Sequence, residues 1–458
     1  MDKKFIKNVA VIALPVALQN LLTTTATMVD TMMLSPLGEL TIGSVGLCAQ
    51  FASLLFSCYW GFACGGMLFF SQYWGSKDDE GIERSYGITL VFMMLVAAAF
   101  TIAALFFPHV IMSTYTDKEA LYPIGIEYLK ICGFAYIPQV YAVIMSSLLR
   151  STERVKIPLC GGIAAAATNI ILDYILIYGK LGLPGLGVRG AALASVCAAY
   201  VNILVIWLLA KKRGFTYIFS FRNHFKWNKK AVGEYFAKCF PIILNELFLG
   251  AATLFLNMML GRQSESAIAA LAVFRTLEGF IIGFFMGFSN AASVLVGKCV
   301  GEGKLKTAYK RGKMLVPLCA TTILFVGLII LAVHNPLLHA MHLHGEAYKI
   351  GTGILVIFCI VAVIRMSNWI QNDTYRAAGD PAYGTILEIV FMYFMVLPVV
   401  YITGIKLRLS IYIVFACCYC DELIRFVLMQ HHMYSGKWIK PVTDVGKRAL
   451  ATFSVREG

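Results

Sequence analysis

The chain has 458 residues, of which 59% are hydrophobic and 14% charged, and its formal net charge is +14. A soluble protein usually carries about 25% charged residues, so this composition argues against a soluble protein and predicts an integral membrane protein. Most of the thirteen cysteines fall within apolar runs, where they behave as small hydrophobic residues rather than as disulfide partners or metal ligands.

About twelve stretches of the chain are long and apolar enough to cross a bilayer, which takes roughly 20 residues of helix. The N-terminus begins like a signal peptide, but the apolar run continues to Leu34 without an A-x-A cleavage site, so it is predicted to be the first span. The predicted spans are 10–34, 44–70, 87–107, 124–148, 157–178, 188–210, 235–260, 268–296, 314–333, 350–374, 383–404 and 409–432.

Lysine and arginine are concentrated in alternate loops, and such residues are retained on the cytoplasmic side of a membrane. With the N-terminus inside, the stretches 211–230 and 297–313 and the basic end of the chain all fall on that side. We therefore predict a multi-pass protein of the cytoplasmic membrane with both termini in the cytoplasm. This bias accounts for most of the positive charge, so the lipid bilayer is expected as a partner and nucleic acid is not.

The two halves of the chain repeat each other at one constant offset in residue number. Pro15 matches Pro241, the sequence MML at 32–34 recurs at 258–260, and Arg150 matches Arg376. Each half has an even number of spans, so the halves are parallel repeats, an architecture typical of transporters with a substrate site near the midplane. The predicted all-α fold has an N-terminal six-helix lobe at 1–210, a cytoplasmic linker at 211–230, a C-terminal six-helix lobe at 231–433 and a basic cytoplasmic tail at 434–458.

Two acidic residues, each in a predicted span of the first half, have no basic residue in their own span. In the first span Thr23, Thr27 and Asp30 are spaced four and three residues apart and share one helix face. In the fifth span Asn169 and Asp173 are four apart and also share a face. If the two faces meet, the carboxylates share a small polar chamber that can take up a proton or hold Na⁺. A buried polar network that only joins the helices is the alternative.

Several stretches together resemble the multidrug and toxic compound extrusion (MATE) transporters. They include "ALPVALQNLLTTTATMVDTMML", "SQYWGSKDD", "TNIILDYILIYGKLGLPGLGVRGAALAS", "PIILNELFLGAATLFLNMMLG", "VGKCVGEGKLKTAY" and "YRAAGDPAYG". The resemblance covers nearly the whole chain. It implies a V-shaped pair of six-helix lobes that exports amphipathic, often cationic, compounds in exchange for H⁺ or Na⁺. The stretch "LLRSTERVKIP" departs from the family, which tends to have a Gly-Asp-Thr-like turn after the arginine.

The resemblance also assigns roles to particular residues. The family places a cation-coupling site on an aspartate of the first span and an Asn-x-x-x-Asp pair of the fifth, which Asp30, Asn169 and Asp173 match here. Ser195 stands where the family often has threonine. In the family the first helix is thought to bend as the site fills, and Pro15 is the candidate hinge, with a static kink as the alternative.

The second half lacks these acids, since apolar residues stand at the three matching positions: Leu256, Met395 and Val399. It carries its own polar residues, which are candidates for a second cation or substrate site: Glu246, Asn257, Arg275, Glu278, Arg365, Asn368 and Glu388. Glu246 roughly resembles an acid that some MATE transporters keep on the seventh span. Structural ion pairing is the alternative, because Arg275 and Glu278 are three apart on one helix.

We therefore predict a secondary antiporter that exports amphipathic, cationic organic compounds by alternating access and works as a monomer. No Walker motif and no Ser-His-Asp set occurs, so an ATP-driven pump and an enzyme are not expected, and no cofactor beyond the coupling H⁺ or Na⁺ is expected. A flippase for a lipid-linked saccharide or another polar metabolite is the alternative function. A channel or receptor is less consistent with the tandem repeat.

Overall fold

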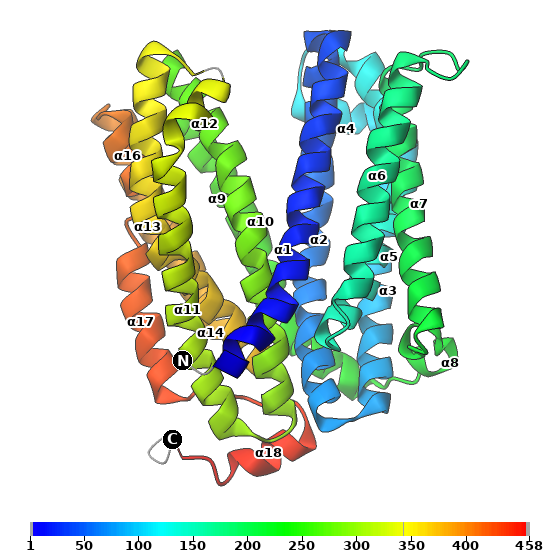
Figure 1. The fold of residues 1–458 in the computed structure, drawn as a ribbon, viewed down its shortest axis with the longest axis vertical. Helices are drawn as coiled ribbons and strands as arrows, with labels where there is room; N and C mark the ends of the chain where they lie inside the picture. Colours follow the sequence, from blue (N-terminus) through cyan, green and yellow to red (C-terminus); the bar gives the residue numbers. More distant parts are fainter. Residues whose placement is uncertain (1–2, 342, 455–458) are drawn as a thin grey trace. The chain divides into compact units, whose positions relative to one another are not determined.

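The structure is a computed structural model that describes residues 3–341 and 343–454, and helices make up the regular structure of these residues (Figure 1). The predicted all-α class is confirmed. The helices of the first half are α1 (Lys3–Leu34), α2 (Glu39–Ser76), α3 (Asp79–Phe106), α4 (Pro108–Tyr115), α5 (Tyr122–Ser151), α6 (Lys156–Tyr178), α7 (Val188–Lys212) and α8 (Phe221–His224). Three short 3₁₀ turns lie between them: η1 (Ser35–Leu37), η2 (Glu119–Leu121) and η3 (Tyr217–Phe219).

The second half is equally helical. Its helices are α9 (Lys229–Leu260), α10 (Glu265–Gly301), α11 (Leu305–Ala332), α12 (His334–Ala340), α13 (Gly345–Ala378), α14 (Pro381–Phe391), α15 (Leu397–Tyr401), α16 (Ile411–Cys417), α17 (Glu422–Ser435) and α18 (Asp444–Leu450). A π-helical segment, η4 (Met392–Val396), joins α14 to α15, and a second one, η5 (Ile402–Lys406), extends α15, so that residues 381–406 form one longer helical stretch.

Eleven helical stretches of the described residues are long and apolar enough to cross a membrane. They correspond to the first eleven predicted spans. The twelfth predicted span, 409–432, is divided into α16 and α17 by a turn at residues 418–421. Three charged residues, Asp421, Glu422 and Arg425, gather at the start of α17 and lower the hydropathy of this stretch, which explains why it differs from the other spans.

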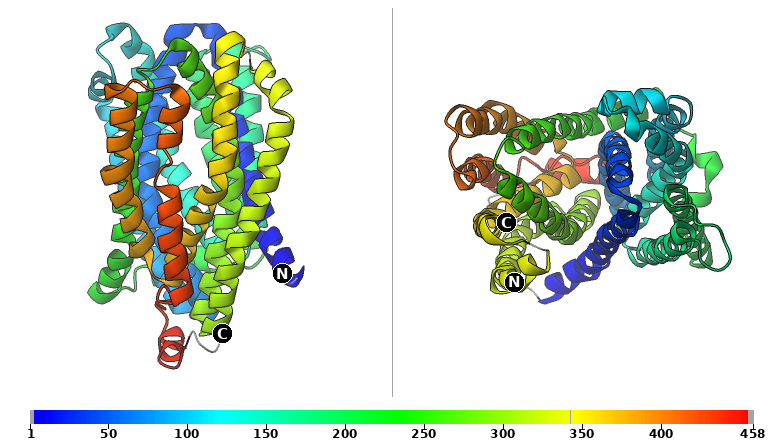
Figure 2. Two further views of the ribbon diagram at one scale, coloured as in Figure 1. Left: turned by 90° about the vertical axis from the view of Figure 1, so that its left-hand side faces the viewer. Right: turned by 90° about the horizontal axis from the view of Figure 1, so that it is seen from above.

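The chain forms two compact units. The N-terminal unit comprises Leu14–Phe70 and Asp78–Cys239, and the C-terminal unit comprises Met1–Ala13, Ser71–Lys77 and Phe240–Gly458. The division of α1 falls directly before Leu14 and that of α9 directly before Phe240, so both precede the matching prolines, Pro15 and Pro241. Within each unit the long helices run along a common direction, as the end-on view shows (Figure 2).

The first part of α9 packs inside the N-terminal unit. The Tyr235 hydroxyl is buried, donates to the Phe62 carbonyl at 2.9 Å and accepts from the Thr89 hydroxyl at 2.9 Å. A Cβ on Gly65 would lie 2.0 Å from the Cys239 sulfur, so α2 can approach α9 this closely only with glycine at that position. These contacts explain why a helix that opens the second half of the chain belongs partly to the first unit.

The linker between the halves is held against α3. Asn223 donates to the Glu83 carboxylate at 2.7 Å, and the Tyr217 hydroxyl donates to Asp79. The His224 ring is buried, its Nε2 lies 2.7 Å from the Tyr217 carbonyl, and burial lowers the pKa of this imidazole. A Cβ on Gly87 of α3 would lie 1.8 Å from the His224 carbonyl oxygen, so the linker can dock here only because residue 87 is glycine.

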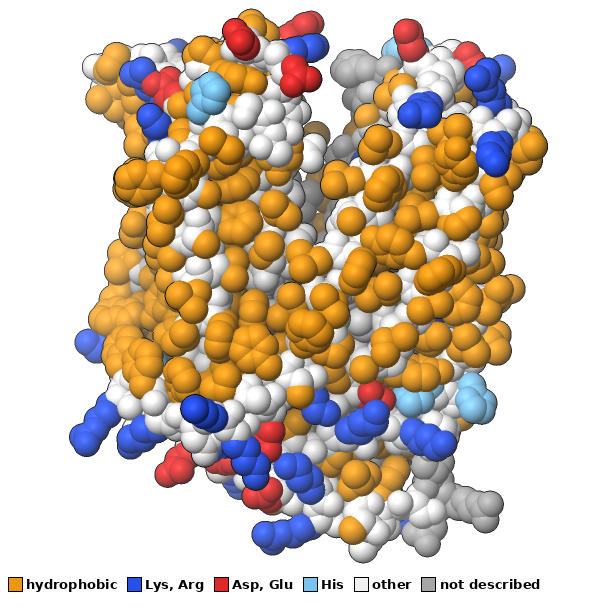
Figure 3. All heavy atoms as spheres, turned by 180° about the vertical axis from the view of Figure 1, so that it is seen from behind, with side chains coloured by type: hydrophobic (Ala, Val, Ile, Leu, Met, Phe, Trp, Pro, Cys, Tyr) orange, Lys and Arg blue, Asp and Glu red, His pale blue; other side chains and the backbone are white. Residues whose placement is uncertain are grey.

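Hydrophobic side chains cover the middle of each unit's surface, while lysine, arginine and acidic side chains gather toward the ends of the helices (Figure 3). Many large apolar side chains on the long helices are exposed, among them Leu14, Phe325, Ile360 and Phe394. A soluble protein rarely exposes apolar surface over so large an area. The exposed band is the surface that a bilayer would cover.

The docking of the linker can be tested by replacing Gly87 with alanine. We expect Gly87→Ala to lower the melting temperature in detergent clearly, because the added methyl group would displace the linker backbone. The matched control is Gly46→Ala in α2, where a Cβ meets nothing within 4 Å and alanine favours the helix by up to about 1 kcal/mol. Equal melting temperatures for the two variants would contradict the tight contact.

Candidate cation site

Helices α1 and α6 run parallel within the N-terminal unit, and two contacts fix their register. A Cβ on Gly162 would lie 3.0 Å from the Gln19 side chain, and Ile177 packs with Leu34 in one apolar cluster. The two residues of each pair are the same number of positions apart in the sequence, and Asp30 and Asp173 are separated by that same number. The structure therefore brings the two predicted acids to the same level of neighbouring helices.

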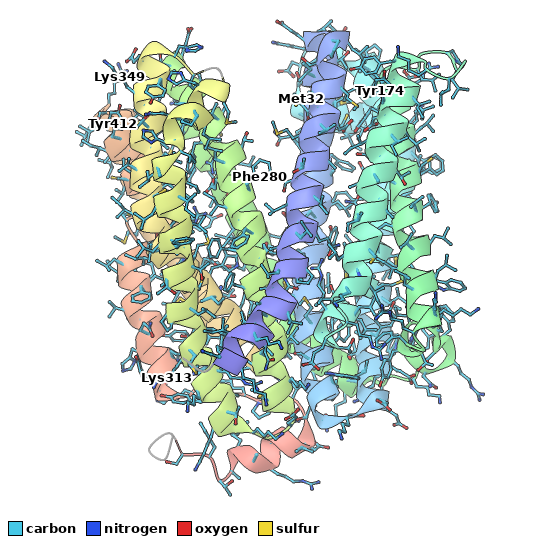
Figure 4. All side chains as sticks on the ribbon, viewed as in Figure 1. Met32, Tyr174, Phe280, Lys313, Lys349 and Tyr412 are labelled. Atoms are coloured by element: carbon cyan, nitrogen blue, oxygen red, sulfur yellow. The ribbon has the colours of Figure 1, made fainter. Side chains whose placement is uncertain are left out.

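The apolar cluster lies one helical turn beyond the acids. It contains Leu34 of α1, Ile177 of α6 and Ala191 of α7, and Tyr128 of α5 packs against it. The Tyr178 hydroxyl donates to the Met33 carbonyl at 2.8 Å and ties the same ends of α1 and α6 together. Met32 and Tyr174 are seen toward this end of the two helices (Figure 4). Packed side chains therefore lie between the acids and the C-terminal ends of α1 and α6.

Helix α7 runs antiparallel to α6 and forms another wall. A Cβ on Gly190 would lie 2.7 Å from the Leu176 backbone, and one on Gly161 would lie 2.6 Å from the Ile206 side chain. This register places Ser195 at the level of the turn of α6 that contains Asp173. Ser195 also lies one turn from Ala191 on the same face of α7. Its hydroxyl is therefore a further oxygen near the acids.

The carboxylates of this region are buried without hydrogen bonds. The Asp173 side chain is fully buried, and neither of its oxygens has a partner among the described residues. Asp30 is partly buried, and its Oδ1 is likewise unpartnered. Asn169 is partly buried one turn from Asp173 on the same face of α6. Every unpartnered atom of these carboxylates is an acceptor, so a proton or a cation is a chemically suitable complement for this site.

The threonine hydroxyls of the predicted polar stripe bond within α1. Thr23 donates to the Gln19 carbonyl at 3.0 Å and Thr27 donates to the Thr23 carbonyl at 3.1 Å. Both residues are exposed. Their hydroxyl protons are therefore used by the helix itself.

The candidate hinge, Pro15, lies inside α1 at the division between the two units. One turn further along α1, the Gln19 amide oxygen accepts a hydrogen bond from the Arg150 guanidinium at 2.8 Å. This bond fastens α1 to α5 directly after the proline. Residues before Pro15 and residues after it are consequently held by different parts of the protein.

The C-terminal candidates form a chain of ion pairs instead of an unpaired acid site. Glu278 is buried and contacts the Arg275 guanidinium at 3.0 Å and the Arg365 guanidinium at 2.8 Å. Arg275 also donates to the Asn257 side chain at 3.0 Å. Each charge in this group therefore has an opposite partner, and Glu246 takes no part in these ion pairs among the residues described.

The chain of ion pairs continues into α17, whose residues Glu422 and Arg425 were not among the residues predicted from the sequence. Asn368 donates to the Glu422 carboxylate at 2.7 Å, and Arg425 contacts Glu422 at 3.3 Å and Glu388 at 3.7 Å. Glu388 also accepts from Asn245 at 3.1 Å. The charges of the last predicted span were the available signal for Glu422 and Arg425. Their partners lie on other helices, so spacing along one helix could not identify them.

Comparisons with known proteins identify the family. The sequence model of the MatE family matches residues 15–175 and 241–402, and the two matched segments begin at Pro15 and Pro241, the matching prolines of the repeat. The chain belongs to the MatE family. The predicted membership of the MATE family is confirmed.

Sequence similarity to known proteins extends over most of the length of this MATE chain. It is 21% identical over 412 residues to the uncharacterized transporter YisQ of Bacillus subtilis, covering 90% of each chain. It is 23% identical over 446 residues to the probable multidrug resistance protein NorM of Thermotoga maritima, covering 95% of this chain and 93% of the relative.

Solved MATE structures share the fold. A crystal structure of the Vibrio cholerae MATE transporter VcmN superposes with a TM-score of 0.85 at 16% identity, covering 99% of both chains. A crystal structure of MATE in the bent conformation superposes with a TM-score of 0.81 at 19% identity, covering 94% of this chain and 96% of the other. Together with the eleven candidate spans, these matches show that the chain is a multi-pass membrane protein with the MATE fold.

The unpartnered state of Asp173 leads to a stability prediction. We expect Asp173→Asn to melt at the same temperature as the wild-type protein or higher at neutral pH, because asparagine removes a buried charge that no donor satisfies. The measurement is the melting temperature of purified protein in detergent without Na⁺. A clear decrease would mean that the carboxylate makes a structural bond, and it would contradict the geometry described above.

Proposed function

We propose that this MATE protein is a secondary antiporter that exports amphipathic organic cations in exchange for H⁺ or Na⁺. The observation that carries the proposal is the matched position of Asp30 and Asp173 with unpartnered carboxylate oxygens. The names of relatives such as the multidrug resistance protein NorM support multidrug export. They lend no support to the flippase alternative.

The coupling step follows from the charge of the site. With both carboxylates ionised, the pair repels itself and is poorly solvated, so helices α1 and α6 are held together less favourably at this level. Binding of H⁺ or Na⁺ removes that repulsion. A cation that binds one arrangement of the helices better than another shifts the population toward the first. Release of the cation then favours the arrangement that is competent to bind substrate.

The oxygen atoms around the acids are suited to either coupling ion. A proton needs only Asp30 or Asp173 as its acceptor. Na⁺ needs several oxygen ligands, which Asp30, Asp173, the Asn169 carbonyl and the Ser195 hydroxyl would supply. These four residues form the proposed coupling site, and Pro15 is the proposed hinge of α1. The C-terminal acids and arginines are proposed to stabilise that unit through their ion pairs.

The transport prediction concerns the two carboxylates. We expect Asp30→Asn and Asp173→Asn each to reduce gradient-driven export from proteoliposomes by at least about tenfold, because asparagine cannot exchange a proton or carry charge. The measurement applies a pH gradient and a Na⁺ gradient separately to liposomes loaded with a cationic dye. The gradient that drives wild-type export identifies the coupling ion.

The matched control is Asp117→Asn, which removes an exposed acid outside the candidate spans. It should export at the wild-type rate. Near-normal export by both Asp30→Asn and Asp173→Asn would overturn the coupling role and leave the acids with a structural one. If neither gradient drives export by the wild-type protein, the antiport function itself is overturned.

We propose that both chain termini and the linker lie in the cytoplasm, on the basis of the lysine and arginine asymmetry. A cysteine at Leu183, which is exposed in the loop between α6 and α7, should react with a membrane-impermeant maleimide in intact cells. A cysteine at the exposed Thr452 should react only after permeabilisation. The wild-type protein, with its own cysteines, provides the background, and the reverse pattern would contradict this orientation.

A further inference from the structure

The last turns of α2 belong to a different unit from the rest of that helix. Residues 39–70 of α2 lie in the N-terminal unit, whereas Ser71–Lys77 lie in the C-terminal unit. The end of α10, which matches the end of α2 in the repeat, lies in the same unit as the rest of α10. One helix therefore continues from one unit into the other, and contacts specific to the end of α2 must hold it there.

The end of α2 crosses α10 with backbone against backbone. A Cβ on Gly75 would lie 2.1 Å from the Lys298 carbonyl oxygen, and one on Gly301 would lie 1.9 Å from the Gln72 carbonyl oxygen. Gln72 and Lys298 are repeat partners, as are Gly75 and Gly301, since both pairs have the offset that relates the two halves of the chain. The crossing is thus symmetric between the two halves of the repeat.

A buried side chain of α2 joins this crossing to the C-terminal segment. Gln72 is fully buried, and its Nε2 donates to the Ala377 carbonyl at the end of α13 at 2.8 Å. Its Oε1 accepts from the Val442 backbone N–H at 2.8 Å. One amide therefore satisfies two backbone groups, and it links α2, α13 and the segment after α17.

We call residues Gly436–Thr443 the strap, and it is itself firmly attached to the C-terminal unit. Trp438 is fully buried, donates to the Met433 carbonyl at 2.9 Å and packs over Gly312 of α11. The Lys440 backbone N–H donates to Ala378 at 2.9 Å, and the Thr443 hydroxyl donates to Gly301 at 3.1 Å. The strap therefore touches α10, α11 and α13, and two of these helices, α10 and α13, also contact the end of α2.

An ion pair reinforces the strap where it passes the turn between α13 and α14. The Lys440 ammonium lies 2.9 Å from one Asp380 oxygen, and the His432 ring nitrogen lies 3.1 Å from the other. Burial alone would raise the pKa of the Asp380 carboxyl, but the bonds from His432 and Lys440 outweigh it and hold this pKa below its usual range. Asp380 therefore stays ionised at neutral pH.

We propose that the strap and Gln72 form a latch that fixes the end of α2 to the C-terminal unit, so that α2 transmits movement between the units during transport. The division between the units falls between Phe70 and Ser71, inside α2. If the latch holds, the end of α2 moves with the C-terminal unit while the body of the helix moves with the N-terminal unit. The latch itself does not depend on the proposed antiport function, but the role of the latch in transport rests on that function.

The test uses Gln72→Leu in the full-length protein, because leucine keeps the bulk of the side chain and loses both hydrogen bonds. We expect amide hydrogen exchange in residues 71–77 and 438–443 to rise by about tenfold, since two buried bonds are lost. Exchange in the α6 segment that contains Asp173 should stay unchanged. Gradient-driven export should fall by a similar factor.

The matched control is Gln371→Leu, which also replaces a fully buried glutamine of the C-terminal unit. The Gln371 amide donates within α13, to the Ser367 carbonyl at 3.2 Å, so exchange in 71–77 should stay at the wild-type level. A second variant ends the chain after Leu450 and keeps the strap; it should behave as the wild type. Unchanged exchange in residues 71–77 of Gln72→Leu would overturn the latch, and raised exchange with wild-type export would overturn its role in transport.

These outcomes separate the latch from the antiport function. Hydrogen exchange is measured on purified protein without any gradient, so it reports on the latch whether or not export is observed. If the wild type fails to export while exchange in Gln72→Leu rises as expected, the antiport proposal is at fault and the latch stands as a structural element.

Discussion

Asp173 directs both of its carboxylate oxygens into the interior of the N-terminal unit, where no donor among the described residues reaches them. A buried charge without a partner costs several kcal/mol in a protein interior. A proton or a metal cation would supply the partner that the described residues do not. The parallel register of α1 and α6 sets a second acid at the same level.

The two halves of the repeat differ in the partners of their buried acids. At the positions that match Gln19 and Gly162 of the N-terminal unit, the C-terminal unit has Asn245 and Glu388, and these two residues bond to each other. Its other fully buried acids are ion-paired, Glu278 with Arg365 and Asp380 with Lys440. The repeated backbone is therefore similar, but the first unit holds unpartnered acids on α1 and α6, whereas the fully buried acids of the second unit are ion-paired and its partly buried Glu246 takes no part in those pairs. This asymmetry is what the proposed one-sided coupling requires.

Much of the fold could be predicted from the sequence because the signals are local. Apolar runs of about 20 residues specify spans, and the constant offset that takes Pro15 to Pro241 specifies the repeat. The shared face of Asn169 and Asp173 follows from their spacing on one helix. The family resemblance added Ser195, which lies on another helix and has no spacing relation to the acids.

The features that the sequence did not reveal all depend on contacts between distant segments. The division of 409–432 into two helices follows charges whose partners, such as Glu388, are on other helices. Gln72 looks like an ordinary polar residue near the end of a span, and only the fold brings Val442 to it. The assignment of the first turns of α9 to the N-terminal unit likewise rests on bonds of Tyr235 to α2 and α3.

The proposed transport mechanism depends on the exchange of a cation at Asp30 and Asp173. Infrared difference spectroscopy on reconstituted protein tests it most directly, by recording the carboxyl bands before and after a change of pH or the addition of Na⁺. We expect a carboxyl signal in the wild type that is absent from the variant carrying both Asp30→Asn and Asp173→Asn. The same signal in both proteins, or no carboxyl signal in the wild type under either change, would contradict it.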